Sequence, residues 1–348
     1  MLFLLLGLGM TLALTQILGG GEGEEEETVE DNGFERVDEG VYEGGDGDDR
    51  LLFSDLDDED PLNLESVSGG AGNDLIDLVH EGKELSFYGT AEYGSVDDID
   101  PRGILNVSLG DGDDTLRSFV WESVDAGAGD DLLELGQYSS NGVLVYGGDG
   151  DDTIDALNME NETIYGGAGD DEISITGPSY GGAGYVAVAY GGEGDDHLTV
   201  VTDTKFNDKG LFADGHPPVL EGGAGADMFT VQIVPGLQES ELDPNFFDGD
   251  RPVDVDSTTA AWVRHFEPGI DKLILDVEAQ AGAITLDHIR MEEVGEGWFA
   301  GQTAITLRYD VADGIDREQV IYVKATGLTW DDITLEGATR DVLVPLAA

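Results

Sequence analysis

The chain has 348 residues, of which 76 are acidic and 15 basic, which leaves 61 net negative charges at pH 7. No basic stripe exists to meet phosphates, so a nucleic-acid partner is excluded; without cysteine, disulfides, thiolate metal sites and cysteine nucleophiles are excluded too. Because 40% apolar residues suffice for a core, the like charge must be spread over a hydrated exterior or neutralised by bound cations.

The first predicted element is an apolar run at residues 2–18, followed by a Gly- and Glu-rich stretch at residues 19–30. The run is borderline in length for a membrane helix and long for the apolar part of a signal peptide. Signal sequence, membrane anchor and hydrophobic start of the fold remain open, with targeting or anchoring preferred. We assign residues 1–20 to this segment and residues 21–43 to an acidic linker and N-terminal cap.

Eight segments between residues 44 and 230 then share one frame, with aspartate at position six and an apolar residue at position eight. The segments begin at Gly44, Gly69, Leu109, Ala126, Gly147, Gly166, Gly191 and Gly222. The aspartates are Asp49, Asp74, Asp114, Asp131, Asp152, Asp171, Asp196 and Asp227. The apolar residues are Leu51, Ile76, Leu116, Leu133, Ile154, Ile173, Leu198 and Phe229. A further glycine turn at Gly181 lacks the aspartate.

This frame predicts a metal-binding turn followed by a strand. Glycines at alternate positions let the backbone adopt positive φ and turn its carbonyl oxygens inward. The aspartate adds a carboxylate, and hard oxygen ligands of this kind suit Ca²⁺. The apolar residue at position eight points into a core. Glycine and aspartate also favour ordinary turns, but eight turns in frame, each with its apolar residue in phase, argue against that alternative.

The spacing of the segments predicts a solenoid. Their starts differ by 25, 40, 17, 21, 19, 25 and 31 residues, which leaves room for two strands per coil. After Gly147, for example, we expect a strand at 153–157, a turn at 158–161 and a strand at 163–165. The eight motifs would stack as a single column on one edge of a right-handed coil. The variable loops 55–63, 81–103 and 202–218 would lie on the other edge. The Gly181 turn would lie there too, between strands at 172–176 and 185–190.

These segments resemble the repeats-in-toxin family, the hemolysin-type calcium-binding repeats, whose consensus is G-G-x-G-x-D-x-U-x. The resemblance implies an all-β, right-handed parallel β-roll in which each Ca²⁺ lies between two stacked turns, so eight turns would hold up to about seven ions. It also implies that the eight aspartates supply carboxylates and that the turns supply backbone carbonyls; Leu109 and Ala126 depart from the consensus by replacing its first glycine. The implied carbonyl donors are Gly44, Asp46, Gly47, Gly69, Ala71, Gly72, Leu109, Asp111, Gly112, Ala126, Ala128, Gly129, Gly147, Asp149, Gly150, Gly166, Ala168, Gly169, Gly191, Glu193, Gly194, Gly222, Ala224 and Gly225.

The repeats stop after about residue 232, which gives a β-roll at 44–232 and a C-terminal domain at 233–348. Alternation at 272–277, 304–309 and 319–323 predicts strands. The Phe-Glu-Pro-Gly-Ile-Asp stretch within residues 263–275 is similar to a strand start found downstream of such repeats in type I secreted proteins. The last residues, 341–348, are similar to type I secretion signals. A cap over the open end of the solenoid is the alternative role, and the two are compatible.

No catalytic residue and no cofactor-binding residue is predicted. None of the five histidines lies in an H-E-x-x-H pattern, and neither a nucleophile elbow nor a phosphate-binding loop is present. His197 occupies the variable seventh repeat position and is interpreted as a solvated strand residue. The acidic stretches at 248–251 and 254–256 are interpreted as solvated loops in preference to a further Ca²⁺ site.

The sequence therefore predicts a non-enzymatic, extracellular calcium-binding protein, secreted or attached to a cell surface. It would be exported unfolded by type I secretion machinery and would fold on binding Ca²⁺. One alternative is an enzyme or toxin whose active site lies in the C-terminal third. Another is an adhesin whose loops opposite the calcium column bind a carbohydrate or another surface. Exposed aromatic residues clustered on one face would favour it, and the candidates are Tyr88, Tyr93, Phe206 and Phe212; such residues more often pack locally under a loop.

Overall fold

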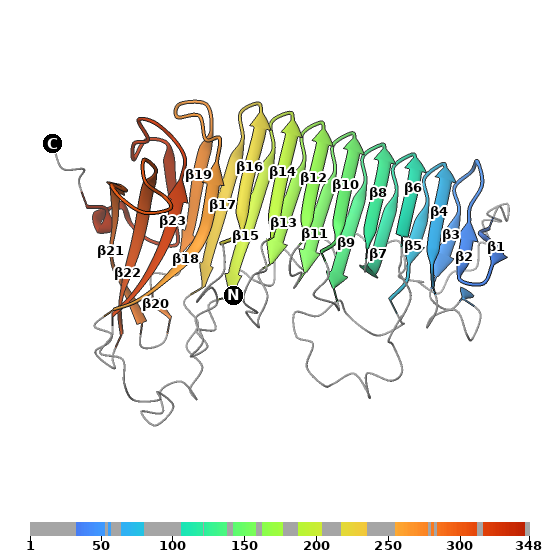
Figure 1. The fold of residues 1–348 in the computed structure, drawn as a ribbon, viewed down its shortest axis with the longest axis horizontal. Coiled ribbons are helices and arrows are strands. Elements are labelled where there is room, and N and C mark those ends of the chain that lie inside the picture. Colours follow the sequence, from blue (N-terminus) through green and yellow to red (C-terminus); the bar gives the residue numbers. More distant parts are fainter. Residues whose placement is uncertain are drawn as a thin grey trace, which may run out of the picture. The chain divides into compact units, whose positions relative to one another are not determined.

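The computed structural model describes a protein built almost entirely of β-strands (Figure 1). It describes residues 33–52, 55–56, 64–79, 106–120, 122–137, 142–157, 162–176, 187–203, 217–234, 255–277, 280–281, 284–311 and 316–344. All of these lie in one compact unit, Asn32–Ala348. The apolar run at 2–18, the Gly181 turn and nearly all of the three variable loops lie outside the described residues.

The strands form two sheets, and consecutive strands of the repeat region alternate between them. The larger sheet has the order β1 (Glu35–Asp38), β2 (Val41–Glu43), β4 (Ser66–Ala71), β6 (Asn106–Asp111), β8 (Ser123–Ala128), β10 (Leu144–Asp149), β12 (Thr163–Ala168), β14 (Val188–Glu193), β16 (Val219–Ala224), β18 (Val255–Arg264), β23 (Asp316–Val323), β22 (Thr303–Val311), β21 (Ile284–Glu293) and β20 (Gln280–Ala281). The smaller sheet has the order β24 (Ile333–Glu336), β19 (Lys272–Val277), β17 (Met228–Val234), β15 (His197–Asp203), β13 (Glu172–Thr176), β11 (Thr153–Leu157), β9 (Leu132–Gln137), β7 (Thr115–Val120), β5 (Leu75–Asp77) and β3 (Arg50–Leu52).

The register confirms that the eight motifs stack as one column. In the larger sheet Gly148 lies opposite Gly127 on one side and Gly167 on the other. In the smaller sheet Ile154 lies opposite Leu133 and Ile173. The pairing is parallel from β2 to β18 and from β3 to β24, which is the arrangement of a parallel β-roll. Each repeat position thus forms a straight row across the strands.

The core lies between the two sheets and follows from the period of two along each strand. In β10 the residues alternate between exposed and buried, so that Val145 is 0% exposed while Leu144 is 43% exposed. The position-eight residues of the smaller sheet, such as Ile154 and Ile173, are fully buried from the other side. Every position-eight residue predicted to start a strand and point inward does so.

The strands predicted at 153–157, 172–176 and 272–277 are confirmed as β11, β13 and β19. Those predicted at 304–309 and 319–323 lie within β22 and β23. The strand predicted at 163–165 is longer than expected, because β12 runs on through the first three turn positions to Ala168. These turn positions continue the ladder since they pair with the same positions of the turns before and after them.

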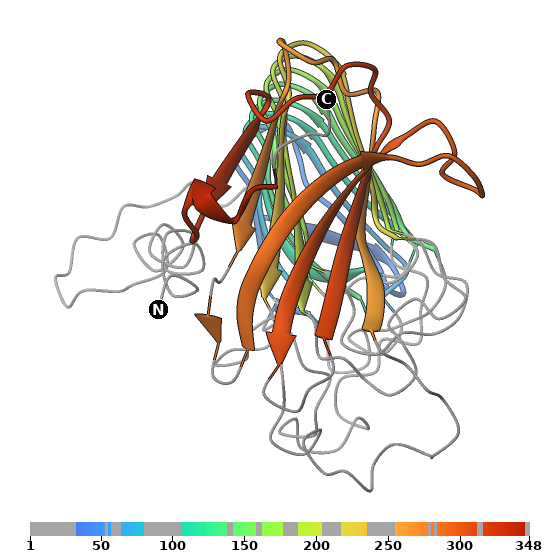
Figure 2. The same ribbon diagram turned by 90° about the vertical axis from the view of Figure 1, so that its left-hand side faces the viewer.

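The C-terminal third is β-rich, as predicted, and changes the direction of pairing. Strand β18 is parallel to β16 and β23, whereas β22 is antiparallel to both of its neighbours, β23 and β21. Figure 2 shows these four strands as a curved sheet at one end of the roll. Their inner face carries Ile289, Leu307 and Ile321, all 0% exposed. No helix in the described part of the chain is long and apolar enough to cross a membrane.

Candidate metal centre

The eight position-six aspartates form a hydrogen-bonded ladder along one edge of the roll. Each is 1–3% exposed. The backbone N–H of each donates to Oδ1 of the aspartate in the next turn, from Asp49 to Asp74 (2.8 Å) through to Asp196 and Asp227 (3.2 Å). Parallel stacking produces this ladder, because it places the same residue of every turn directly beside its counterpart. One oxygen of each interior carboxylate is therefore satisfied by protein.

The second carboxylate oxygen, Oδ2, has no such protein partner in most of these aspartates. Among the described residues, Oδ2 of six successive aspartates is buried without a hydrogen-bond partner: Asp74, Asp114, Asp131, Asp152, Asp171 and Asp196. A buried carboxylate oxygen without a partner is strongly unfavourable, so such atoms in native proteins are matched by a donor or a cation. Six in one row, at equivalent positions, indicate a repeated cation site.

Backbone oxygens converge on the same space. A methyl group built on Gly147 would collide with Asp152 Oδ2 and lie 2.6 Å from the carbonyl oxygen of Gly166 in the next turn. At Gly191 the corresponding carbonyl is that of Gly222, at 2.7 Å. Carboxylate and position-one carbonyl oxygens thus face one small space between adjacent turns. An all-oxygen donor set of this kind fits Ca²⁺, so the residues present suit the predicted ion.

The position-three carbonyls predicted as ligands also serve the turns themselves. The N–H of each position-four glycine donates to the position-three carbonyl of the next turn, for example Gly150 to Ala168 (2.7 Å) and Gly129 to Asp149 (2.8 Å). A carbonyl has two lone pairs, so one remains for an ion. In the described residues no three His, Asp or Glu side chains gather at one point; an ion here would depend on backbone oxygens.

Burial and like charge raise the aspartate pKa values. Desolvation by burial is the main cause, hydrogen bonds from the neighbouring backbone oppose it, and adjacent carboxylates add to it. The pKa is raised to about 7 for Asp131 and Asp171 and to about 6 for Asp114, Asp152, Asp196 and Asp227. In the absence of a cation these groups therefore tend to hold protons near neutral pH.

The two departures from the repeat consensus leave the turn unchanged. Gly110 and Gly127, at position two, have φ of +127° and +114°, close to their counterparts in later turns. Position one does not adopt positive φ, so a residue with a side chain fits there. Leu109 and Ala126 each occupy it fully buried, and their turns pair in register with the turns on either side.

A ninth aspartate, which the repeat frame did not predict, continues the ladder. Asp227 N–H donates to Asp271 Oδ1 (3.1 Å), and Asp271 Oδ2 accepts the N–H of Glu267 (2.7 Å). Gly269, Asp271 and Leu273 fall at positions four, six and eight of a frame that starts at Phe266, and this signal could have revealed the turn. Both carboxylate oxygens of Asp271 accept backbone N–H groups. Asp271 is therefore the last aspartate of the ladder, and its carboxylate is satisfied by protein donors.

Asp332 supports this last turn from the C-terminal strands. Its Oδ1 accepts the N–H of Gly269 (2.9 Å), and its Oδ2 accepts the N–H and hydroxyl of Thr329 (2.9 and 2.8 Å). Burial by itself would raise the pKa of Asp332, but these hydrogen bonds and nearby Lys272 outweigh it and lower that pKa. In contrast to the ladder aspartates, Asp332 has its charge fully matched without an ion.

A second, exposed row runs along position five and was missed because the repeat consensus leaves that position variable. Here the hydrogen bonds run the other way: Asp151 N–H donates back to Asp130 Oδ1 (2.9 Å), and Asp170 N–H to Asp151 Oδ1 (2.8 Å). Side chains at positions five and six therefore bind the turns on opposite sides of their own.

The interpretation of His197 as a solvated residue is wrong. The side chain is half-buried, its Nε2 lies 2.9 Å from Thr230 Oγ1, and burial lowers its pKa. The side chain is on the outer face of the smaller sheet, but side chains of the two neighbouring parallel strands cover it from both sides. Of the acidic stretches at 248–251 and 254–256, no side chain lies within the described residues.

Comparison with known proteins agrees with the geometry. The family described as the RTX calcium-binding nonapeptide repeat matches the chain at residues 65–78, 144–158 and 159–174. No curated protein matches the chain. The matched segments include three of the ladder aspartates, Asp74, Asp152 and Asp171. With its parallel β-roll and its column of glycine–aspartate turns, the chain carries calcium-binding repeats of the RTX type.

Proposed function

We propose that this is an extracellular, non-enzymatic protein whose repeat region folds when Ca²⁺ binds between the stacked turns. The observation that carries the proposal is the row of six buried Oδ2 atoms without a protein partner. Each ion would take carboxylate oxygens from the aspartates and carbonyl oxygens from position one and its neighbours. Bound Ca²⁺ supplies positive charge that removes the repulsion between the carboxylates and the need to protonate them.

The distribution of free oxygens refines the expected number of ions. The six gaps that follow Asp74 through Asp196 are equivalent, each with a buried Oδ2 to offer. The first gap differs, because Asp49 Oδ2 accepts the N–H of Gly45 in its own turn and the buried oxygen without a partner is Oδ1. We therefore expect six similar Ca²⁺ ions, with a weaker seventh in the first gap. Six ions would change the charge from −61 to about −49.

An extracellular location follows from the affinity expected for such sites. Extracellular calcium modules bind at roughly 10⁻⁴–10⁻³ M, so the ladder would be empty in a cytosol poor in calcium. Its carboxylates would then repel one another, and the glycine turns would carry a large backbone entropy cost. The repeat region would stay unfolded until export through type I machinery.

The C-terminal residues fit the same sequence of events. In the folded protein Val344 N–H donates to Ile289 O (2.9 Å), and Trp330 Nε1 donates to Val344 O (3.3 Å). The described start of a secretion signal at 341–348 would be held against β21 at Val344 after folding and accessible before it. We assign 44–232 to the calcium-binding roll and 233–348 to the domain that both caps it and directs secretion.

The test is a titration of calcium-stripped protein with Ca²⁺, followed by far-ultraviolet circular dichroism, with Mg²⁺ as the control ion. We expect a cooperative gain of β signal with Ca²⁺ alone, because Mg²⁺ keeps its waters and does not fit a backbone cage. Native mass spectrometry of the product should show six to seven bound ions. A chain that is fully folded after chelation would refute the proposal.

A further inference from the structure

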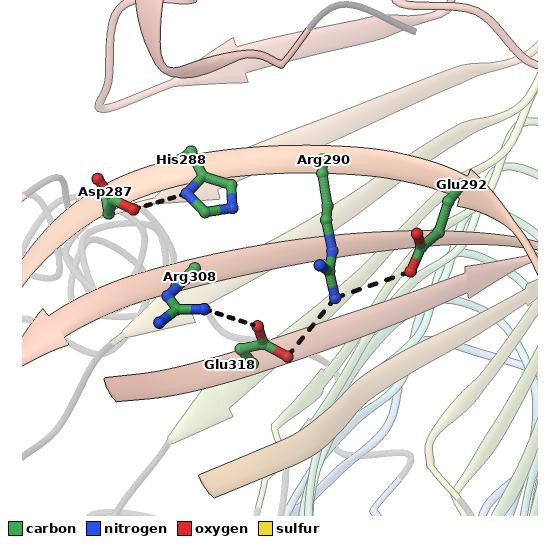
Figure 3. Close-up of polar contacts among 6 residues, drawn as sticks. All are labelled: Asp287, His288, Arg290, Glu292, Arg308 and Glu318. Atoms are coloured by element: carbon green, nitrogen blue, oxygen red, sulfur yellow. Dashed lines mark hydrogen bonds and ion pairs between the residues drawn. The ribbon is translucent and has the colours of Figure 1, made fainter. Parts of the chain in front are cut away.

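Two arginines of the C-terminal sheet, Arg290 and Arg308, have carboxylate partners. Figure 3 shows Arg290 between Glu292 (3.7 Å) and Glu318 (3.8 Å), and Arg308 beside the other oxygen of Glu318 (3.7 Å). With 76 acidic residues against 15 basic ones, such partners are easily found. A cation on this surface without one is therefore informative.

Arg264 and Lys324 are such cations. They lie at the ends of the neighbouring strands β18 and β23, where Lys324 N–H donates to Val263 O (2.9 Å). Within the described residues neither side chain has a carboxylate at ion-pair distance. Glu221 lies opposite Arg264 on β16, but its Oε1 is 2.6 Å from His265 Nδ1. Arg264 instead lies over the ring of Trp262, 3.8 Å from its centroid.

Arg264 is held in place by an aromatic group. Trp262 Nε1 donates to Gln302 Oε1 (2.7 Å), and Phe299 meets the Trp262 ring edge-on with centroids 5.3 Å apart. Phe299 in turn stacks on Tyr322 at 3.7 Å. A guanidinium stacked on a fixed ring loses little entropy when it binds an anion, so the site is preorganised.

The two cations end a straight row of tyrosines. Tyr146, Tyr165 and Tyr190 occupy the same register row as Glu221 and Arg264, on β10, β12, β14, β16 and β18. Their rings stack in parallel with centroids 5.1 and 5.0 Å apart, and Tyr146 and Tyr165 are 41% and 36% exposed. With Lys324 the row crosses six strands, roughly 24 Å of sheet.

We propose that this row on the outer face of the larger sheet binds a linear polysaccharide that carries carboxylate groups. Arg264 and Lys324 supply the charge for a carboxylate, and a guanidinium can bind it with two parallel hydrogen bonds. The tyrosines present apolar ring edges and hydroxyl groups at regular intervals, which suits an extended polymer rich in hydroxyls. The row lies on the outer face of the sheet, one residue before the position-one glycines of the turns.

Charge selects this partner over other anions. A lipid surface or nucleic acid is bound through many basic residues spread over a face, whereas here two cations stand beside Glu221 in a chain of net charge −61. At physiological ionic strength the remaining charges are screened beyond about 8 Å. A polymer with spaced carboxylates meets the two cations without bringing a dense negative surface close to the protein.

The test uses the full-length protein in Ca²⁺ and hyaluronan oligosaccharides, whose glucuronate units carry the carboxylates, with binding measured by isothermal titration calorimetry. We expect saturable binding that falls at least tenfold in Arg264→Ala and in Lys324→Glu. Lys324 is exposed, so its replacement leaves the fold intact; circular dichroism checks both variants. Arg308→Ala is the matched control, since Arg308 lies on the neighbouring strand β22 but is paired with Glu318, and it should bind normally.

Two further ligands complete the design. Carboxyl-reduced hyaluronan should bind at least tenfold more weakly to the native protein, and Tyr165→Ala should weaken binding of both polymers. The proposal is overturned if the protein does not bind hyaluronan, if Lys324→Glu binds like Arg308→Ala, or if carboxyl reduction has no effect. Stronger binding to phosphatidylglycerol vesicles than to hyaluronan would also overturn it, because the row would then recognise a lipid surface.

Discussion

At the scale of single residues, positions five and six of the same turn carry chemically identical side chains with different surroundings. Asp152 is 1% exposed, and its Oδ2 has no partner in the described residues. Asp151 is exposed, and its Oδ1 accepts the N–H of Asp170. The orientation of the turn, rather than the residue type, thus decides which aspartate can hold an ion.

Replacing Asp152 with Asn should weaken Ca²⁺ binding and Asp151→Asn should not. The first change removes a ligand charge from two adjacent gaps, and we expect the free energy of unfolding in Ca²⁺ to fall by about 2–3 kcal/mol, the value of hydrogen bonds to charged groups. Guanidinium unfolding in saturating Ca²⁺ gives the comparison. Equal losses in the two variants would contradict the assignment of the ladder.

The raised pKa values predict a pH dependence with a definite sign. The folded-state pKa of Asp131 and Asp171 is about 7, above the ordinary value near 3.9. Protonation therefore stabilises the calcium-free roll below pH 4, and that contribution is lost as the pH rises through 6 to 7. Ca²⁺ must displace these protons, so the Ca²⁺ midpoint should rise as the pH falls from 8 to 5. A midpoint constant over this range would contradict the shifts.

At the scale of the turn, two glycines at neighbouring positions have different tolerance. Gly148 has φ of +129°, and a Cβ there would collide with the carbonyl oxygen of Gly127 in the preceding turn. Gly147 precedes it at position one, where Ala126 stands in the preceding turn. Position two of the turn therefore requires the positive φ of glycine, whereas at position one the backbone does not require it and a Cβ on Gly147 would instead meet the Asp152 carboxylate and the Gly166 carbonyl oxygen.

We accordingly expect Gly148→Ala to destabilise the Ca²⁺-bound roll far more than Gly147→Ala. The positive φ alone costs roughly 1–2 kcal/mol, and the collision with backbone adds to it. Thermal unfolding in Ca²⁺ measures both variants. A Gly147→Ala protein as unstable as Gly148→Ala would show that the alanine in the fourth turn needs compensation elsewhere.

The residues at position three of the turns are arranged so that repulsion between their carboxylates is limited. Along position three, acidic residues and alanines alternate without exception in the eight turns: Asp46, Ala71, Asp111, Ala128, Asp149, Ala168, Glu193 and Ala224. Ala168 lies between Asp149 and Glu193 in the sheet register. Like charges directly opposite each other destabilise a sheet, so the alternation keeps the position-three carboxylates two strands apart.

Replacing Ala168 with Asp would place three acidic residues in adjacent turns. The variant should lose roughly 0.5–1 kcal/mol of stability at low salt, and added salt should restore most of it by screening. The control is Ala168→Asn, whose side chain has nearly the size of aspartate but no charge; its stability should be close to that of the native protein. A loss that is independent of salt would mean that size, not charge, governs this position.

At the scale of the described fold, the roll and the C-terminal strands differ in their need for ions. In the described residues the ladder aspartates of the roll have six buried Oδ2 atoms without partners, and Asp49 adds its Oδ1, whereas Asp271 and Asp332 have both oxygens matched by protein donors. The C-terminal strands also have their own buried core, which includes Ile305 and Ile321. Chelation should therefore unfold the two parts unequally.

After chelation we expect a residual β signal with its own thermal transition. Asp332→Ala should lower the midpoint of that transition, because Thr329 and Gly269 lose their acceptor. Asp331→Ala, at the exposed neighbouring position, serves as the control. Complete loss of β signal on chelation would show that the C-terminal strands fold only on the calcium-bound roll.

Much of this architecture could be read from local pattern. Glycine and aspartate determine a turn within six residues, and position eight determines which side of the next strand is buried, so the column of motifs and β11, β13 and β19 were predicted. The ends of β12 were not, because whether a turn residue continues a ladder depends on its neighbour in the adjacent coil.

The sequence by itself determined that this chain forms a β-roll of glycine–aspartate turns suited to Ca²⁺, because that chemistry is local and repeats. Only the tertiary structure decided which carboxylate oxygens remain for ions, because one oxygen of each carboxylate accepts a backbone N–H of the preceding turn, 17 to 40 residues away within the repeats. It likewise brought Asp271 to Asp227 across 44 residues and left Arg264 and Lys324 side by side without a carboxylate partner in the described residues. Contacts between distant segments depend on the stacking of whole coils, and no short stretch of sequence records them.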